Sequence, residues 1–214
     1  MRARDVALVV LAKAPHPGRV KTRLCPPCTP GDAAALAAAA LADTLATVAA
    51  TDARGRYLVL DGVPGPWLPP GFTVVPQEGD GLGERLGAAF GAVGGPAVLV
   101  GMDTPQVTPS LLGAAAASLA RPGRDAVLGP ARDGGYWCIG LRRPDPRVFA
   151  GVPMSTTITG DVQLARLHEL GLAVELLPRL RDVDVFRDAL AVAREVPGSR
   201  FASTLASLAA EWVA

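Results

Sequence analysis

Short, continuous apolar runs alternate along this chain with segments whose apolar residues recur at helical spacing. The run Ala7–Leu11 is unbroken, and further strand patterns occur at Ala97–Asp103 and Ala173–Leu177. An unbroken apolar run of this length is typical of a strand that is buried on both faces, as in a parallel sheet covered by helices. Because such strands alternate here with helices, the sequence predicts an α/β fold with a layered, mostly parallel sheet.

The remaining elements follow from the same patterns. Further strands are predicted at Arg56–Gly62, Phe72–Gln77, Asp125–Ala131 and Gly135–Leu141. A helix is predicted from Ala33 to Ala50 with Asp32 as its cap, and another follows the segment 79–85 and extends to Val93. Four more helices are predicted: after Thr108, from Gly160 to Gly171, after Asp184, and around Phe201–Trp212. With 214 residues and no internal repeat, we expect one domain that spans residues 1–214.

Composition limits the classes of function. The formal net charge of +1 argues against a broad nucleic-acid interface. We find no run long and apolar enough to span a membrane, and the first residues lack the features of a signal peptide. A cytoplasmic protein is therefore expected, and its C-terminal helix either covers the core of a monomer or forms the face of a homodimer.

The stretch "LAKAPHPGRVKTRL" (Leu11–Leu24) follows the first strand and holds both lysines of the chain, whose other basic residues are all arginines. Lys13, Arg19, Lys21 and Arg23 surround Gly18, which permits a turn. Such cations, with backbone amides, are suited to bind a di- or triphosphate, although a solvated basic loop has the same pattern. The chain has neither G-x-x-x-x-G-K-[ST] nor G-x-G-x-x-G, so neither standard nucleotide loop is predicted.

Carboxylates follow two other predicted strands. Asp103 ends the run "AVLVGMD", where it is placed either to bind a divalent cation or to make a turn before Pro105. Asp182 and Asp184 are two residues apart, so in an extended segment they point the same way. Asp184 is then either a second metal carboxylate or the N-cap of the helix that follows.

A glycine turn in "ARDGGYWC" is a third candidate. Asp133 and Gly134 form a hairpin signal between two predicted strands. The same turn can instead let a substrate approach the backbone at Gly134 and Gly135 while Asp133 faces it.

The three cysteines do not favour a metal or redox site. Cys25 and Cys28 have the C-x-x-C spacing, but a zinc site needs a second pair and only Cys138 remains. A redox motif needs a helix that starts at the cysteines, and the prolines around Cys28 oppose one.

Taken together, the motifs resemble a known family. "LAKAPHPGRVKTRL", "LADTL", "GLGERL", "GMDTP", "GPARDGGYWCIGL", "MSTTI" and "LRDVDVFRDAL" occur in the order of the DUF2064 proteins, small GT-A-like transferases. These are related to MobA-like and 2-phospholactate guanylyltransferase-type nucleotidyltransferases. The resemblance extends to about Leu190, and it implies a GT-A fold with a three-layer, Rossmann-type arrangement.

The resemblance also implies roles for particular residues. Nucleotide contacts would come from Ala12, Lys13, Gly18, Arg19, Lys21, Arg23, Gly83 and Arg85. A Mg²⁺ or Mn²⁺ ion would bind Asp103 and Asp184, and the groups expected at the reaction centre are Lys21, Asp103 and Asp133. The acceptor would contact Gly134, Gly135, Tyr136, Ser155 and Thr156. The chain departs from the usual family pattern at Met102, Thr104 and Met154, and after Asp184.

The expected function is transfer from a nucleotide-activated donor, most simply a nucleotide sugar, to a small-molecule acceptor. One alternative is a nucleotidyltransferase that joins a nucleoside triphosphate to a phosphorylated small molecule and releases pyrophosphate. Another is a non-catalytic nucleotide-binding protein. Because lysine is a compact charge on a flexible stem and arginine a planar fork, we expect Lys21 to be retained for close contact with phosphate.

Overall fold

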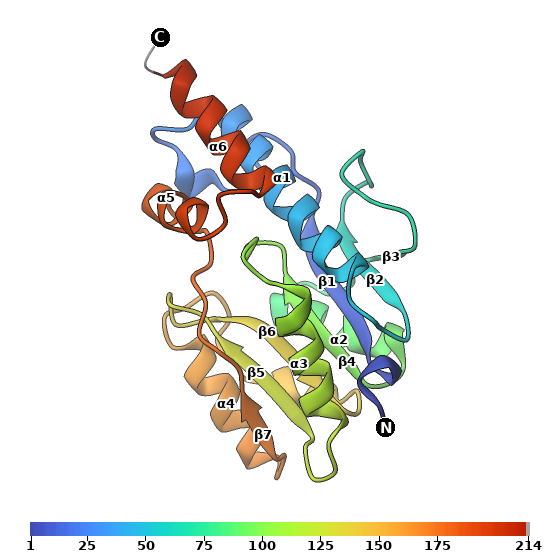
Figure 1. Cartoon of the computed structure of the whole chain (residues 1–214). Coiled ribbons are helices and arrows are strands. Elements are labelled where there is room, and N and C mark those ends of the chain that lie inside the picture. The colour runs from blue at the N-terminus through green and yellow to red at the C-terminus, as the bar shows by residue number, and fades with distance from the viewer. Residues whose placement is uncertain (213–214) are drawn as a thin grey trace.

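The computed structural model describes residues 1–212 and contains a seven-stranded sheet with helices on both faces (Figure 1). The order of the strands in the sheet is β3-β2-β1-β4-β6-β5-β7. Their bounds are β1 Ala7–Lys13, β2 Arg56–Asp61, β3 Thr73–Pro76, β4 Ala97–Gly101, β5 Ala126–Pro130, β6 Tyr136–Leu141 and β7 Val174–Leu176. The predicted α/β class and the GT-A-like layered sheet are confirmed.

The direction of β6 determines which residues meet at the edge of the sheet. Strand β1 is parallel to β2 and β4, whereas β6 is antiparallel to both of its neighbours, β4 and β5. Val100 of β4 therefore lies opposite Cys138 of β6. As a result, the start of β6 lies at the edge where β1 and β4 end, and the Asp133 turn comes to that edge too.

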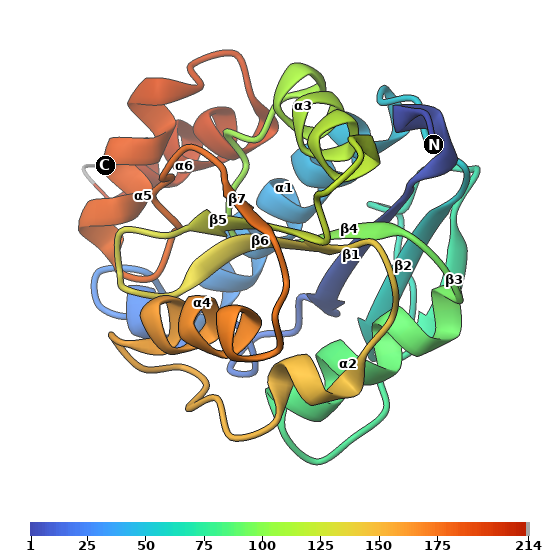
Figure 2. The same ribbon diagram turned by 90° about the horizontal axis from the view of Figure 1, so that it is seen from below.

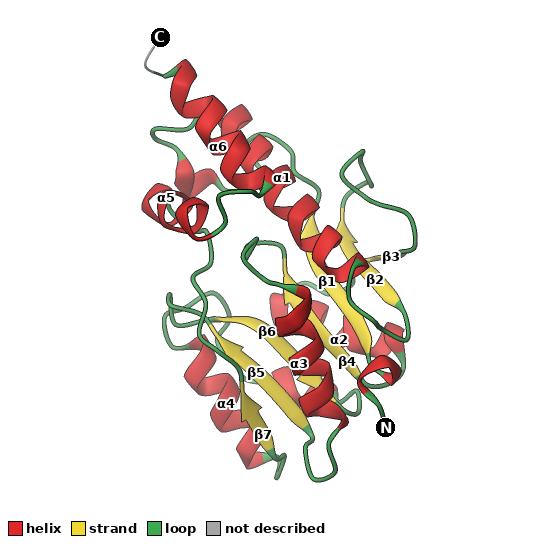
Figure 3. Ribbon diagram, in the orientation of Figure 1, coloured by secondary structure: helices red, strands yellow, loops and turns green. Residues whose placement is uncertain are grey.

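The helices form layers on the two faces (Figure 2). Helices α1 and α3 lie on one face of the sheet, with α5 and α6 beyond them, and α2 and α4 lie on the other. Figure 3 shows the same layers coloured by secondary structure. The helix bounds are α1 Pro30–Ala49, α2 Leu82–Val93, α3 Pro109–Ala120, α4 Thr159–Glu169, α5 Phe186–Glu195 and α6 Arg200–Glu211, and the short 3₁₀ turns are η1 Ala3–Asp5, η2 Thr22–Leu24 and η3 Pro146–Phe149.

The predicted cap of the first helix is wrong, and of the two alternatives for Asp184 the N-cap is excluded. Thr29, not Asp32, is the N-cap of α1: the Thr29 hydroxyl accepts from the backbone N–H of Asp32, and the Asp32 carboxylate accepts from that of Thr29. The cap lies three residues earlier because Pro30 at the first helical position extends the helix. Helix α5 has Val185 as its N-cap, and Asp184 points instead to Arg23.

Helix α1 is buried on two sides. Leu41 and Leu45 pack into the core against the sheet, while Leu36 packs into a second cluster with Phe201 of α6. By length and composition α1 is apolar enough to cross a membrane, so the expectation that no segment has this character is wrong. In the structure 61% of its most apolar stretch is buried, as in a core helix.

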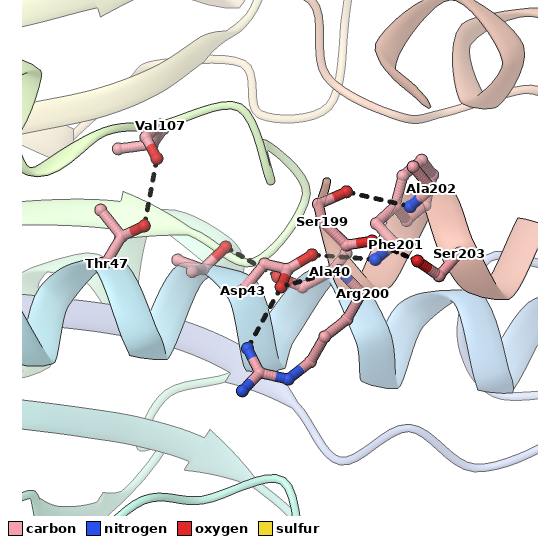
Figure 4. A network of polar contacts seen from close by, with 10 residues as sticks. Ala40, Asp43, Thr47, Val107, Ser199, Arg200, Phe201, Ala202 and Ser203 are labelled. Carbon is pink, nitrogen blue, oxygen red and sulfur yellow. Dashed lines mark hydrogen bonds and ion pairs between the residues drawn. The ribbon is translucent and has the colours of Figure 1, made fainter. Parts of the chain in front are cut away.

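The C-terminal helix α6 is fixed to α1 by one carboxylate (Figure 4). Asp43 of α1 accepts hydrogen bonds from the backbone N–H of Arg200 at 3.2 Å and of Phe201 at 2.9 Å, and from the Arg200 guanidinium at 3.3 Å. Ser199 caps the same helix through the N–H of Ala202. Asp43 of α1 and Ser199 therefore satisfy donors at the start of α6 that the helix itself leaves free.

Candidate active site

A cavity of about 670 Å³ lies where β1 and β4 end and β6 begins. In open α/β sheets this edge is where ligands bind, and the volume is in the usual range for small-molecule sites. The structure brings together here most of the residues that the sequence singled out: Ala12, Lys13, Arg19, Lys21, Arg23, Arg85, Asp103, Asp133, Gly135, Tyr136, Ser155, Thr156 and Asp184.

Three predicted contact residues do not line this cavity, and each is a glycine. Gly18, at φ +76°, turns the loop after β1, and Gly83 packs in α2 against the Phe149 carbonyl. Gly134 lines a second cavity, of about 450 Å³, on the other side of its turn. These glycines shape the segments that carry the side chains of the site, since a glycine motif signals backbone geometry as readily as ligand contact.

Lys21 lies at the centre of the site. Its Nζ is 2.8 Å from Asp103 Oδ1 and also donates to the backbone carbonyl of Val183. Only 11% of the Lys21 side chain is exposed, and its backbone has φ +49°, a left-handed conformation that costs a non-glycine residue free energy. Ser155, with φ +61°, also lines the cavity. Left-handed residues of this kind cluster at functional sites.

Asp103 lies two residues beyond the end of β4. Its backbone carbonyl accepts from the N–H of Val183, which joins the β4 loop to the segment before α5. Within residues 1–212, Asp103 Oδ1 is buried and, apart from its ion pair with Lys21, has no hydrogen-bond partner; the buried Thr104 hydroxyl also has none. A buried hydroxyl without a partner is rare in proteins, so Thr104 is suited to receive another polar group beside Asp103, whose Oδ1 is already paired with Lys21.

The segment before α5 supplies two carboxylates with different surroundings. Asp184 Oδ2 is paired with Arg23 at 2.6 Å. Asp182 also lines the cavity; burial, and after it the charge of Asp133, raise its pKa to about 6, while Lys21 lowers this pKa and Asp103 raises it. Asp182 therefore interacts electrostatically with Lys21, whereas Asp184 pairs with Arg23. The sequence alone did not distinguish these two carboxylates, because they lie only two residues apart.

The Asp133 turn is held by backbone contacts. Asp133 Oδ1 accepts from the N–H of Gly135 at 2.8 Å, and the Gly134 carbonyl accepts from the N–H of Gly160 at 2.7 Å. Gly134 has φ +93°, and a Cβ there would lie 1.8 Å from the Thr157 carbonyl oxygen. The turn is thus pressed against the start of α4, and it holds Asp133 at the cavity mouth.

One wall of the cavity is formed by Tyr136 and its neighbours. The Tyr136 hydroxyl donates to Gln163 Oε1 at 3.3 Å, and Gln163 Nε2 donates to the Val148 carbonyl at 2.8 Å. Burial raises the pKa of Tyr136, so the phenol is neutral. The thioether of Met154 lies 3.9 Å from this hydroxyl, and Met154 also lines the cavity.

The opposite wall is organised by Gln77, which the sequence did not single out. Gln77 Nε2 donates to the Ala12 carbonyl at 2.7 Å, and Arg85 lies beside Gln77 Oε1 at 3.4 Å. Arg85 also donates to the Gly79 carbonyl and faces Asp61 at 3.7 Å. A glutamine within a strand pattern carries no local signal, because its role depends on the distant end of β1.

The chemistry of the acidic groups fits a divalent cation that also binds a ligand. No group of three or more His, Cys, Asp or Glu side chains in the described part of the chain is arranged to hold a metal. Mg²⁺ commonly takes only one or two carboxylates and completes its shell with water and phosphate oxygens. Asp103, with its buried oxygen, and Asp182 meet that requirement.

Two of the three cysteines, Cys28 and Cys138, are buried, and Cys138 lines the cavity. Cys28 is buried and burial raises its pKa to about 11, which disfavours the thiolate needed for redox or metal chemistry. Cys138 is buried in β6, and burial raises its pKa as well.

Solved structures with the same fold include three informative ones. A Desulfovibrio desulfuricans G20 protein, described provisionally as a nucleotide-diphospho-sugar transferase, is 28% identical, with 98% of this chain and 96% of that chain covered and a TM-score of 0.87. The Mycobacterium tuberculosis H37Rv protein Rv0371c in complex with manganese is 22% identical, with 89% and 98% covered and a TM-score of 0.51. CMP:2-keto-3-deoxy-manno-octonic acid synthetase, complexed with CTP, is 11% identical, with 89% and 99% covered and a TM-score of 0.56.

At these low identities the last two structures show the fold alone. Among curated proteins, none matches the sequence. The model of a family described as uncharacterized proteins conserved in bacteria, DUF2064, matches residues 33–156, which is more than half of the chain. This protein therefore belongs to the DUF2064 family.

Proposed function

We propose that this protein is a divalent-metal-dependent transferase that uses a nucleotide sugar as donor and a small molecule as acceptor. One observation carries the proposal: Lys21 Nζ and Asp103 Oδ1 are 2.8 Å apart in a cavity that Asp133 and Asp182 also line. Cations and carboxylates that face the same cavity suit a ligand with both phosphate groups and a bound metal ion.

The loop after β1 is the proposed diphosphate site. Lys13, Arg19, Lys21 and Arg23 all line the cavity from this loop. Their charges would stabilise the leaving nucleoside diphosphate as negative charge develops on it. The nucleoside would then lie toward Ala12 and Arg85, where backbone and guanidinium groups form the wall.

We assign the metal role to Asp103 and Asp182, and Asp182 thereby replaces Asp184, which the family resemblance implied as the second metal carboxylate. The interaction of Asp182 with the charges of Asp103 and Lys21, and the ion pair of Asp184 with Arg23, support this assignment. A Mg²⁺ or Mn²⁺ ion held by these two carboxylates would supply positive charge at the diphosphate.

The acceptor is placed at Gly135, Tyr136, Ser155 and Thr156, which share the cavity with Asp133. In the proposed reaction the acceptor hydroxyl oxygen bonds to the anomeric carbon, and the bond from that carbon to the diphosphate oxygen breaks. The nucleoside diphosphate leaves with the electron pair, and Asp133 takes the hydroxyl proton. The hydrogen bond from the N–H of Gly135 fixes Asp133 for that step.

A nucleotidyltransferase is the second candidate, and the number of cations on the β1 loop favours it. Four cationic side chains from one loop line the cavity, enough to match the charge of a triphosphate. In this reaction an acceptor oxygen would bond to the α-phosphorus, and the α–β bridging bond would break to release pyrophosphate. The same loop and carboxylates serve both candidates.

The released product distinguishes the candidates. The protein is incubated with Mg²⁺ or Mn²⁺, a panel of nucleotide sugars and nucleoside triphosphates, and a mixture of small-molecule acceptors. Release of nucleoside diphosphate supports glycosyl transfer, and release of pyrophosphate supports nucleotidyl transfer. Binding of a nucleotide with no product of either kind would favour the non-catalytic alternative.

Binding measurements test the site itself. Asp103→Asn removes a carboxylate charge, so we expect metal-dependent nucleotide affinity to fall by at least about tenfold, measured by calorimetry with and without EDTA. Arg143→Ala is the matched control, because Arg143 is exposed and does not line the cavity. Equal affinities for wild type and Asp103→Asn would contradict the proposed site.

A further inference from the structure

The side chain of Lys21 is tied to two chain segments that are far apart in sequence. Its ammonium contacts Asp103 after β4 and the Val183 carbonyl before α5. The side chain is nearly buried, and the left-handed backbone of Lys21 immediately precedes the turn η2. The ammonium is therefore held in a defined position between the two acidic segments.

That position overlaps with the proposed metal site. Lys21 Nζ lies 2.8 Å from Asp103 Oδ1, a buried carboxylate oxygen whose one polar partner within residues 1–212 is that ammonium. The charge of Lys21 also lowers the pKa of Asp182, the other proposed metal carboxylate. The Lys21 ammonium is in contact with Asp103 and acts on Asp182 through its charge, so it lies where a divalent cation would bind.

We propose that the Lys21 ammonium and a divalent cation compete for Asp103, so that the cation binds tightly only after nucleotide phosphates draw Lys21 away. This inference rests on the proposed function and adds an order of binding to it. Two cations that share one partly buried carboxylate repel each other strongly, because the surroundings screen charge less than water does. Phosphate oxygens offer the ammonium an alternative partner.

The chemistry of lysine suits this exchange. Its four-carbon stem lets Nζ move from a carboxylate to a phosphate without a change in the backbone, and its ammonium makes no fixed fork of hydrogen bonds. In a chain that otherwise uses arginine, this gives a physical reason for lysine at position 21. The exchange makes binding of nucleotide and of cation mutually favourable, and thermodynamic linkage makes that coupling reciprocal.

Mn²⁺ alone is the direct probe, because free Mn²⁺ can be counted by electron paramagnetic resonance. The full-length chain is titrated with Mn²⁺ in the absence of nucleotide, as wild type and as Lys21→Met. We expect Lys21→Met to bind Mn²⁺ at least about tenfold more tightly than wild type, within the range typical of coupled sites. Lys21→Arg, which keeps the charge, should not gain affinity.

Two other variants separate direct competition from a general change in charge. Lys13→Met and Arg23→Met each remove one positive charge from the same cavity but not from Asp103. Both should change Mn²⁺ affinity by less than about threefold, since exposed charges act weakly at a distance. The competition is refuted if Lys21→Met gains no more than Lys13→Met or Arg23→Met.

A second measurement uses the unmodified chain and does not depend on the folding of any Lys21 variant. With only two lysines, selective ¹³C-lysine labelling gives two side-chain signals, which Lys13→Arg assigns. The Lys21 εCH₂ signal should shift on addition of a nucleoside diphosphate with Mg²⁺. If the nucleotide binds and the Lys21 signal does not move, the exchange is wrong.

Failure of the exchange differs from failure of the proposed function. If no nucleoside di- or triphosphate binds with or without Mn²⁺, the proposed function fails, and the exchange fails with it. If nucleotides bind in a Mn²⁺-dependent way and Lys21→Met leaves the affinity for Mn²⁺ alone unchanged, only the exchange is refuted.

Discussion

Replacing Gly134 with alanine tests how the Asp133 turn is built. Gly134 combines a left-handed φ of +93° with close contact, since an added Cβ would lie 1.8 Å from the Thr157 carbonyl oxygen and 2.5 Å from its carbon. Both are backbone atoms, so the contact cannot be relieved by a side-chain rotation. The turn or the start of α4 must move.

The size of the effect follows from two separate costs. A left-handed conformation costs a non-glycine residue about 1–2 kcal/mol. Overpacking against a fixed neighbour adds about 1–3 kcal/mol. For a chain of this length each kcal/mol lowers Tm by about 2–4 °C, so Gly134→Ala should melt about 4–20 °C below wild type.

Gly171→Ala is the matched control, because Gly171 also has a positive φ, +73°, but no atom lies within 4 Å of an added Cβ. It should lose about 1–2 kcal/mol, the backbone cost alone. Differential scanning calorimetry measures both variants under the same conditions. In Gly134→Ala the amide of Gly160, which donates to the Gly134 carbonyl at 2.7 Å, should also exchange with solvent faster. If the two variants melt within about 2 °C of each other, the contact with Thr157 is not the constraint described here.

Two further perturbations test packing and charge. Asp43→Ala removes the three hydrogen bonds that fix the start of α6. It should lower the free energy of unfolding, measured in urea, by about 1–2 kcal/mol, and Asp43→Asn should lower it by less. Equal stability of Asp43→Ala and wild type would contradict the capping role. Because burial, followed by the charge of Asp133, raises the pKa of Asp182 to about 6 from 3.8, the fold favours the protonated carboxyl, and stability is lost as pH rises from about 4 through 6. In EDTA, Asp182→Asn should therefore be more stable than wild type by about 1–2 kcal/mol at pH 7.5, a value reduced to allow for solvent screening. At pH 4 the two proteins should be equally stable. The same difference at both pH values would argue against the raised pKa of Asp182 as the cause.

Local signals in the sequence were sufficient for most elements and for the position of the site. Thr108 and Pro109 predicted the start of α3, where the Thr108 hydroxyl accepts from the N–H of Leu111. The sequence around Gly134 predicted a hairpin turn between two strands, now β5 and β6. These predictions succeeded because caps and turns depend on neighbours within a few residues. The position of the site, at the edge of the sheet where β1 and β4 end, was predicted from the alternation of strands and helices.

The sequence could not predict contacts between distant segments. The choice between Asp182 and Asp184 depends on burial and on which of them faces Arg23, a partner 161 residues away in the case of Asp184. The role of Gln77 depends on the Ala12 carbonyl, 65 residues earlier. Alternating or helical periodicity carries no information about such pairs, because it records only the face on which a residue lies.

The connection between Lys21 and the segment before α5 bears on how the chain matures during synthesis. Its bond to Val183 spans 162 residues, and Asp43 reaches Arg200 across 157. Proteins emerge from the ribosome N-terminus first, and contacts of such long sequence separation form slowly. The contact of Lys21 with Val183 therefore forms only after nearly all of the chain has been translated, and a nascent fragment that ends before β7 contains Asp103 but lacks Val183, the second group that holds Lys21.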